Sequence, residues 1–128
     1  MPFILKIVKS KKAPEAIGPY SQAIAVKNLV FVSGMIALDP ATGKMVSGGV
    51  QEQTARALAS MKAVLKAAGA SEKNVVKTTV FIRDAAMYKH MNEAYAKFFG
   101  RHKPARATLV TGFARDDILV EIDAIASK

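Results

Sequence analysis

Two charged residues near the end of the chain are of the types that could hydrolyse a small organic acid. Arg106 follows Pro104 at the entrance of an expected strand, where its side chain faces inward or into a cleft. Its rigid guanidinium can hold a substrate carboxylate through two parallel hydrogen bonds. Glu121, once partly removed from solvent, can orient a water molecule and move protons. Arg106 and Glu121 are therefore the leading candidates for a site.

This hypothesis depends on how the last two strands pair. Strands are expected at 106–113 and 118–126, joined by a four-residue loop. The pairs expected across a hairpin are Phe113 with Ile118, Val110 with Glu121, and Thr108 with Asp123. Arg106, Glu121 and Asp123 would then share one face of the sheet, and a slip of one residue would separate them. From spacing alone, a buried or interfacial ion pair explains these charges as well as a substrate site does.

Other catalytic arrangements have little support in the sequence. The two histidines, His90 and His102, lack metal-ligand spacing with a partner, and the chain has no cysteine. No nucleophile-elbow motif accompanies the serines. Gly48 and Gly49 lack the lysine and the spacing of a phosphate loop, and more simply begin a helix. We therefore expect no metal site and no catalytic triad.

The composition is that of an ordinary globular protein. The chain has 128 residues, of which 51% are hydrophobic and 23% charged, and its apolar runs are too short to span a membrane. We expect a single domain over residues 1–128. The run 3–8 is too short for a signal-peptide core, and the absence of arginine before Arg56 disfavours a mitochondrial presequence. A cytoplasmic location is expected.

The net charge of +9 raises the possibility of a polyanionic partner such as RNA. Apart from Lys9, Lys11 and Lys12, however, the basic residues are dispersed along the chain. Aromatic residues are not interleaved with them, as a base-stacking surface would require. A solvated basic surface is the simpler interpretation, and nucleic-acid binding is kept as an alternative.

Hydrophobic periodicity and turn residues predict the order βββαβαββ. Strands are expected at 3–8, 20–26, 29–38, 75–82, 106–113 and 118–126. A helix at 50–68 has an apolar stripe of Val50, Thr54, Ala57, Leu58, Met61, Val64, Leu65 and Ala68. A second helix is expected to be capped by Asp84, to end at Gly100 and to bury Tyr88, Met91, Tyr95 and Phe98.

Two helices can cover only one face of a sheet of about six strands. The strand at 29–38 nevertheless carries apolar side chains on both sides, which is typical of a strand buried on both faces. We therefore expect a homo-oligomer in which sheets pack together, and a site that lies between subunits.

Short motifs spread along the chain together resemble one known protein family. They are GPYSQA at 18–23, VSG at 32–34, VVKTTVF at 75–81, NEAY at 92–95, PAR at 104–106 and EIDAIA at 121–126. In this order they are similar to the RidA family of reactive intermediate deaminases, also called the YjgF family. The likeness runs from about residue 14 to residue 126, which is nearly the whole chain.

The resemblance implies a chorismate-mutase-like α+β fold. In this fold a mixed sheet of about six strands carries two helices on one face, and three chains form a homotrimer with a cleft at each interface. The resemblance also implies a deaminase that hydrolyses reactive enamines and imines, such as 2-aminoacrylate and related 2-imino acids, to 2-keto acids and ammonia. No cofactor and no metal is implied.

The resemblance assigns roles to individual positions. Arg106 matches the family's carboxylate-binding arginine, Glu121 the carboxylate that positions water, and Tyr20 a tyrosine that lines the cleft. The further substrate-binding positions are Gly18, Ser33, Asn92 and Thr108. Residue type alone favours simpler interpretations: a core-edge tyrosine at Tyr20, a strand serine bonded to backbone at Ser33, and a solvent-facing amide at Asn92.

Some positions depart from the family pattern. Met35 stands where glutamine is common, Asp123 where glutamate is frequent, and Lys103 where an aromatic residue is common. Met35 and the compact segment 100–103 leave the preferred substrate side chain open. Two alternatives to the deaminase also stay open. They are an RNA-binding endoribonuclease that inhibits translation, which the positive charge would favour, and a non-catalytic trimer that binds small molecules.

Overall fold

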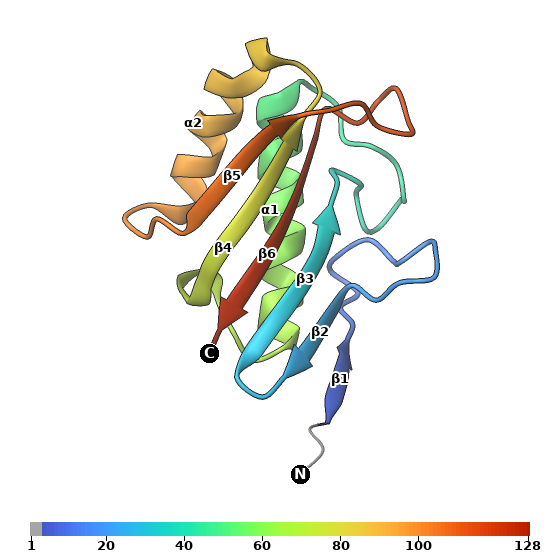
Figure 1. Ribbon diagram of the computed structural model, residues 1–128. Helices are drawn as coiled ribbons and strands as arrows, with labels where there is room; N and C mark the ends of the chain where they lie inside the picture. Colours follow the sequence, from blue (N-terminus) through green and yellow to red (C-terminus); the bar gives the residue numbers. More distant parts are fainter. Residues whose placement is uncertain (1–3) are drawn as a thin grey trace.

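Residues 4–128 are described by a computed structural model, in which six strands form one mixed sheet (Figure 1). The strands are β1 (Leu5–Val8), β2 (Ala23–Val26), β3 (Leu29–Met35), β4 (Val75–Ile82), β5 (Ala105–Val110) and β6 (Val120–Ser127). The helices are α1 (Val50–Ala67) and α2 (Tyr88–Phe99), with the short 3-10 helices η1 (Glu72–Asn74) and η2 (Ala85–Met87). The predicted order of strands and long helices is confirmed, although the expected start of the first strand at Phe3 lies outside the described residues.

The strand order in the sheet is β1-β2-β3-β6-β4-β5. Strands β4 and β5 run parallel, and every other neighbouring pair is antiparallel. The predicted hairpin between the last two strands is therefore wrong, because β4 lies between β5 and β6. A central position lets β6 form hydrogen bonds with β3 on one side and β4 on the other, whereas a terminal hairpin would use only one edge.

This topology changes which side chains share a face. Paired residues on neighbouring strands point to the same side of a sheet, and successive residues alternate. Thr78 pairs with Arg106 on β5 and with Ala124 on β6, and all three point toward the helices. Glu121 pairs with Phe81, an odd number of residues from Thr78, and therefore points to the open face. The prediction that Arg106 and Glu121 share a face is wrong.

Helix α1 covers the centre of the sheet with the stripe that its sequence predicts. The stripe residues Val50, Thr54, Ala57, Leu58, Met61, Val64, Leu65 and Ala68 are all buried. The helix begins after Gly49, whose backbone N–H donates to the Glu52 side chain at 2.7 Å. It ends at Ala67, just before the predicted residue Ala68, and Gly69 follows with a φ of 79°, a conformation that favours glycine.

Helix α2 differs in detail from its prediction. Asp84 caps the 3-10 turn that leads into it, and its carboxylate accepts a hydrogen bond from Ala86 N at 2.8 Å. Met91 and Tyr95 are buried and Phe98 partly so, but Tyr88 is 46% exposed, contrary to the prediction. Tyr88 stands in the first turn of the helix, and its hydroxyl accepts a hydrogen bond from Arg106 on the outermost strand, β5.

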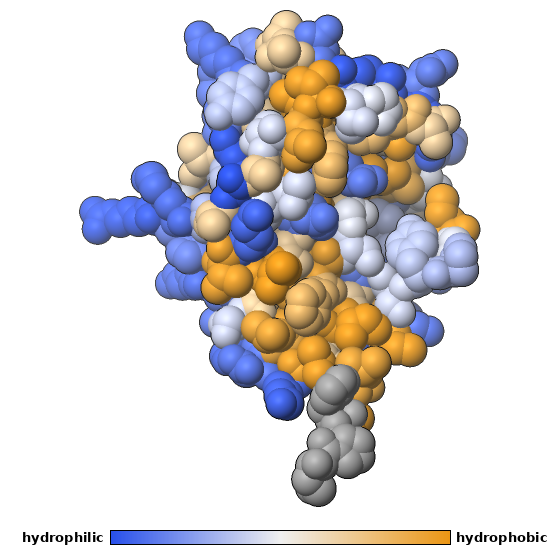
Figure 2. All heavy atoms as spheres, in the orientation of Figure 1, coloured by the Kyte–Doolittle hydropathy of each residue, from blue (hydrophilic) through white to orange (hydrophobic). Residues whose placement is uncertain are grey.

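Within residues 4–128 no helix covers the second face of the sheet, as the helix count predicts (Figure 1). Figure 2 shows apolar side chains gathered on this face, mainly over its lower half. Leu5, Ile7 and Phe31 are exposed there, with 65% of Ile7 accessible to solvent. Strand β3 is thus buried on its helix side only, at Val30, Val32 and Met35. No helix within residues 4–128 is long and apolar enough to cross a membrane.

Candidate active site

Arg106 lies at the edge of the sheet, against helix α2. Its Nη1 donates a hydrogen bond to Asn92 Oδ1 at 2.8 Å, and its Nη2 donates to the Tyr88 hydroxyl at 3.1 Å. The guanidinium carbon stands 4.8 Å from the centre of the Tyr95 ring and 5.7 Å from that of Tyr88, both within cation–π range. Within residues 4–128 Arg106 forms no ion pair with an acidic side chain, so the expected pair with Glu121 or Asp123 is not formed inside one chain.

One face of α2 supplies these contacts. Tyr88, Asn92 and Tyr95 follow one another at spacings of four and three residues, which places them on the same side of a helix. Hydrogen bonding with Asn92 and the charge of Arg106 lower the pKa of Tyr88. The sequence analysis missed Tyr88 and Tyr95 as site residues, although their spacing to Asn92 was visible. Asn92 does not face solvent as its residue type suggests, because its side chain holds the guanidinium.

Tyr95 and Thr108 shape the buried side of this group. The Tyr95 hydroxyl hydrogen-bonds to Thr78 Oγ1 at 2.7 Å, and burial raises the pKa of Tyr95, which keeps the phenol protonated. Thr108 follows Arg106 by two residues on β5 and points to the same face. Its hydroxyl oxygen is buried and has no hydrogen-bond partner within the described residues. A buried hydroxyl that lacks a partner has a free-energy cost, and this oxygen is not accessible to solvent in the single chain.

Glu121 lies half-buried on the open face and next to Asp123. Burial raises the pKa of Glu121, and the negative charge of Asp123 adds a smaller rise. Asp123 is itself engaged, because its Oδ1 accepts a hydrogen bond from the backbone N–H of Thr79 at 3.1 Å. Glu121 therefore holds a proton more readily than a typical glutamate does, which suits a residue that must both accept and return one.

Gly34 leaves the space that the Glu121 side chain occupies. The pairing of β3 with β6 shifts register between Val32 and Met35, and Gly34 lies within this irregularity. A Cβ atom at Gly34 would stand 2.8 Å from both Cδ and Oε2 of Glu121. The carboxylate thus packs directly against backbone, and any residue other than glycine at this position would displace it.

Ser33, Tyr20 and Gly18 belong to the same end of the sheet. Ser33 Oγ donates to the Ser21 carbonyl at 2.6 Å, so this hydroxyl is bonded to backbone as the simpler interpretation held. Tyr20 lies in a loop before β2, 51% exposed, and its N–H donates to the Gly18 carbonyl at 2.8 Å. Tyr20 and Gly34 both line a small hollow of about 40 Å³. These contacts place the loop beside the end of β3, where Gly34 packs against the Glu121 side chain.

The candidate residues therefore form two groups rather than one. We call Arg106, Asn92 and Thr108 the arginine group, which faces the helices at the β5 edge. We call Glu121, Gly34, Tyr20, Ser33 and Gly18 the glutamate group, which lies at the end of β3 on the open face. A small substrate bound to Arg106 of one chain cannot also contact Glu121 of the same chain, because the sheet lies between them.

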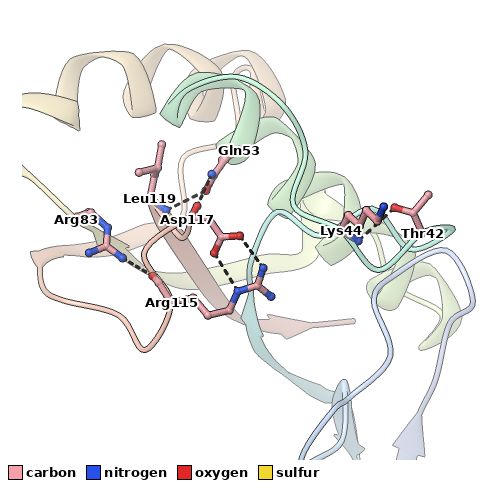
Figure 3. A network of polar contacts seen from close by, with 7 residues as sticks. All are labelled: Thr42, Lys44, Gln53, Arg83, Arg115, Asp117 and Leu119. Carbon is pink, nitrogen blue, oxygen red and sulfur yellow. Dashed lines mark hydrogen bonds and ion pairs between the residues drawn. The ribbon is translucent and has the colours of Figure 1, made fainter.

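Polar contacts hold the connection between β5 and β6, which leads to Glu121; several of them are drawn in Figure 3. Gln53, buried on α1, donates to the Asp117 carbonyl at 2.8 Å and accepts from Leu119 N at 3.0 Å. Arg83 Nε donates to the Ile118 carbonyl at 2.8 Å, and its guanidinium also contacts the Phe113 ring at 5.4 Å. These contacts hold the connection against α1 and the end of β4, two residues before Glu121.

The histidines have ordinary structural contacts. His102 Nε2 hydrogen-bonds with the Val75 carbonyl at 2.6 Å, and His90 Nδ1 lies 3.6 Å from Glu93 on the surface of α2. Over residues 4–128 no three histidine, aspartate or glutamate side chains gather as a metal site would require.

Comparison with known proteins identifies the family. The model of the family described as Endoribonuclease L-PSP matches residues 10–128. This chain belongs to that family, the RidA/YjgF family. The family resemblance expected from the motifs is thereby confirmed.

Individual RidA/YjgF relatives cover almost the whole chain. A RutC family protein of Pyrococcus abyssi is 46% identical over 123 residues, which are 96% of this chain and 97% of that protein. A human protein named 2-iminobutanoate/2-iminopropanoate deaminase is 43% identical over 123 residues, 96% of this chain and 90% of its own. The crystal structure of E. coli TdcF with bound serine superimposes with a TM-score of 0.91 at 38% identity, covering 96% of this chain and 98% of that one.

Proposed function

We propose that this protein hydrolyses 2-imino acids, including the imine tautomer of 2-aminoacrylate, to 2-keto acids and ammonia. The observation that carries the proposal is Arg106, a guanidinium held by Asn92 and Tyr88 with no carboxylate partner within residues 4–128. Two of its five N–H groups are engaged, which leaves three to bind a substrate carboxylate. The deaminase name of the human relative supports the same substrate class.

We also propose that the working form is a homotrimer whose sites lie between subunits. The two groups of candidate residues point to opposite faces, so a site with both Arg106 and Glu121 needs two chains. The exposed apolar residues Leu5, Ile7 and Phe31 supply a surface on which sheets can pack. Each site would take Arg106 from one subunit and Glu121 from its neighbour. The trimeric state is the one that the family resemblance implies.

The proposed roles follow from the contacts of each residue. Arg106 binds the substrate carboxylate, Asn92 sets the plane of the guanidinium, and Thr108 borders the site from the same face of β5. From the neighbouring subunit, Tyr20 closes the site and the Gly18 backbone borders it. Ser33 acts through its hydrogen bond to the Ser21 carbonyl, which positions the loop that carries Tyr20.

Glu121 would move the proton in each step of the reaction. The carboxylate accepts a proton from a water molecule as the water oxygen bonds to the electrophilic imine carbon. The imine nitrogen is protonated when the water attacks, so the resulting intermediate carries a hydroxyl and a neutral amine on that carbon. Glu121 then returns the proton to the amine, the carbon–nitrogen bond breaks and ammonia leaves, and Glu121 takes the hydroxyl proton as the carbonyl forms. The raised pKa of Glu121 favours this shuttle, and one such group contributes about 10²–10⁴-fold to a rate.

The test couples a serine or threonine dehydratase to this protein and follows pyruvate or 2-ketobutyrate formation. The variant Arg106→Lys should lower kcat/KM by about 100-fold, because a lysine ammonium cannot form the two parallel hydrogen bonds that the planar guanidinium makes with the substrate carboxylate. Arg101→Lys is a matched control at an exposed position and should keep the parent rate. An Arg106→Lys protein that clears the imine as fast as the parent would refute the proposal. Carboxylate binding without turnover by the parent protein would indicate a non-catalytic binding trimer.

A further inference from the structure

A basic hollow lies beside α1, away from both groups of candidate catalytic residues. Its volume is about 530 Å³, and it opens between α1 and the loops around residues 11 and 40. The basic residues that line it are Lys11, Lys12, Arg56, Lys62 and Lys66, and the others are Pro40, Ala41, Ala59 and Ala63. No acidic residue is among its lining residues. We refer to this feature as the basic hollow.

The fold assembles the basic hollow from distant parts of the sequence. Lys11 and Lys12 follow β1, and they meet three cations of α1 that come more than forty positions later in the chain. Ala59 and Ala63 lie four residues apart on the same helix face, so the floor between the cations is formed by small side chains. The cluster of lysines after β1, which spacing left without a role, therefore becomes part of a concave cationic surface.

Among the cations of the basic hollow, Arg56 has a side chain that a hydrogen bond holds in place. Its Nη2 donates to Ser60 Oγ at 3.1 Å, and Ser60 is buried in the helix interface. Its Nε is buried and has no hydrogen-bond partner within residues 4–128. The hydrogen bond to Ser60 holds the guanidinium in place and engages one hydrogen of one Nη, so the other Nη hydrogens are the ones that can bind an anion. Lys62 lies 3.9 Å from Glu72, an exposed contact that offsets only one of the five charges.

The spacing of the cations indicates the length of their ligand. Arg56 and Lys66 are ten residues apart on α1, which corresponds to about 15 Å along a helix. A single phosphate ion can contact few of the cations spread along such a row, whereas a chain of phosphates can contact several of them at once. Like charges at Lys62 and Lys66, four residues apart, repel one another, and a bound polyanion would relieve that repulsion.

We propose that the basic hollow binds a linear polyphosphate group, either free or as part of a nucleoside triphosphate. Arginine forks and lysine ammonium groups are the side chains that bind phosphate oxygens. Single-stranded RNA fits the hollow less well, because no aromatic side chain lines it for base stacking. The site shares no residue with the proposed deaminase site, so it represents an additional binding function of the same chain.

The experiment is titration calorimetry of the intact protein with inorganic tripolyphosphate, ATP and an oligouridylate, at about 50 mM and about 200 mM salt. The double variant Arg56→Gln/Lys66→Gln should weaken tripolyphosphate binding by about 10-fold or more. The matched control Lys89→Gln/Lys97→Gln removes two exposed cations of α2 and should leave the affinity within about twofold. Neither double variant should change kcat/KM of the deaminase reaction.

Comparing the three ligands shows which kind of phosphate compound the basic hollow binds. Equal affinity for tripolyphosphate and ATP would support a free polyphosphate, and tighter binding of ATP would support a nucleotide. Equal losses in the two double variants would overturn the proposal, because binding would then follow net charge alone. Tighter binding of oligouridylate than of tripolyphosphate, lost in the Arg56→Gln/Lys66→Gln protein, would overturn it in favour of an RNA groove.

Discussion

Replacing Gly34 with alanine tests whether the position of the Glu121 carboxylate limits catalysis. The new Cβ atom would stand 2.8 Å from Cδ and Oε2 of Glu121, whereas ordinary contact begins near 3.4 Å. The carboxylate must therefore retreat by at least about 0.6 Å, the difference between 3.4 and 2.8 Å. The φ of Gly34 is not in the positive range, so alanine fits the backbone at this position.

We expect the Gly34→Ala substitution to lower kcat/KM much more than it lowers the stability of the fold. The Glu121 side chain is flexible, and moving it off its preferred rotamer costs about 0.5–1.5 kcal/mol. A misplacement of about 1 Å at a reacting group can cost about 100-fold in rate. We therefore expect Gly34→Ala to lower kcat/KM by about 10- to 100-fold, while Tm falls by no more than about 6 °C.

The assay is the coupled dehydratase reaction, with Tm measured on the same preparations at one protein concentration. Gly112→Ala is the matched control, because a Cβ there has nothing within 4 Å and the glycine has no positive φ. The control should keep both the rate and the Tm of the parent. Full activity in Gly34→Ala would refute the reasoning that Glu121 must occupy its observed position, and so would a large loss of Tm without a selective loss of rate.

Two further predictions concern the surroundings of Glu121. Asp123→Asn removes a negative charge that helps to raise the pKa of Glu121, so the acid limb of the kcat/KM profile should move to lower pH; an unmoved limb would contradict the role of Glu121 as the base. Gln53→Leu leaves Leu119 N–H and the Asp117 carbonyl without their partner and should lower Tm by about 5–10 °C. Gln51→Leu, at an exposed position of the same turn, should change Tm little, and equal losses in both would count against a specific role for Gln53.

Local patterns in the sequence predicted the elements well. Strand β4 has the predicted bounds, Val75–Ile82, and α1 ends one residue before its predicted end. Both depend on side-chain periodicity, which is a property of the segment itself. Strand ends were predicted less well, because a strand ends where its hydrogen-bonded pairing ends rather than where the apolar pattern ends. Strand β3 ends at Met35, opposite Ile122 on β6, although apolar residues continue to Leu38.

Strand pairing could not be read from the sequence in the same way. The loop between the last two strands has the composition of a hairpin turn, yet the chain passes over β4 and inserts β6 next to β3. The free energy that decides this is non-local, since it comes from two ladders of hydrogen bonds and from the burial of Val120, Ile122, Ala124 and Ala126 under the helices. A short window of sequence contains none of those partners.

The sequence by itself determined the chemistry that this protein can offer: an arginine for a carboxylate, a glutamate for a proton, and no cysteine for thiol chemistry. These are properties of side chains and survive any arrangement of strands. Only the tertiary structure decided that Arg106 and Glu121 lie on opposite faces, that Gly34 makes room for the glutamate, and that five scattered cations line one hollow. Each of these depends on contacts between segments far apart in the chain, whose free energy no local pattern encodes.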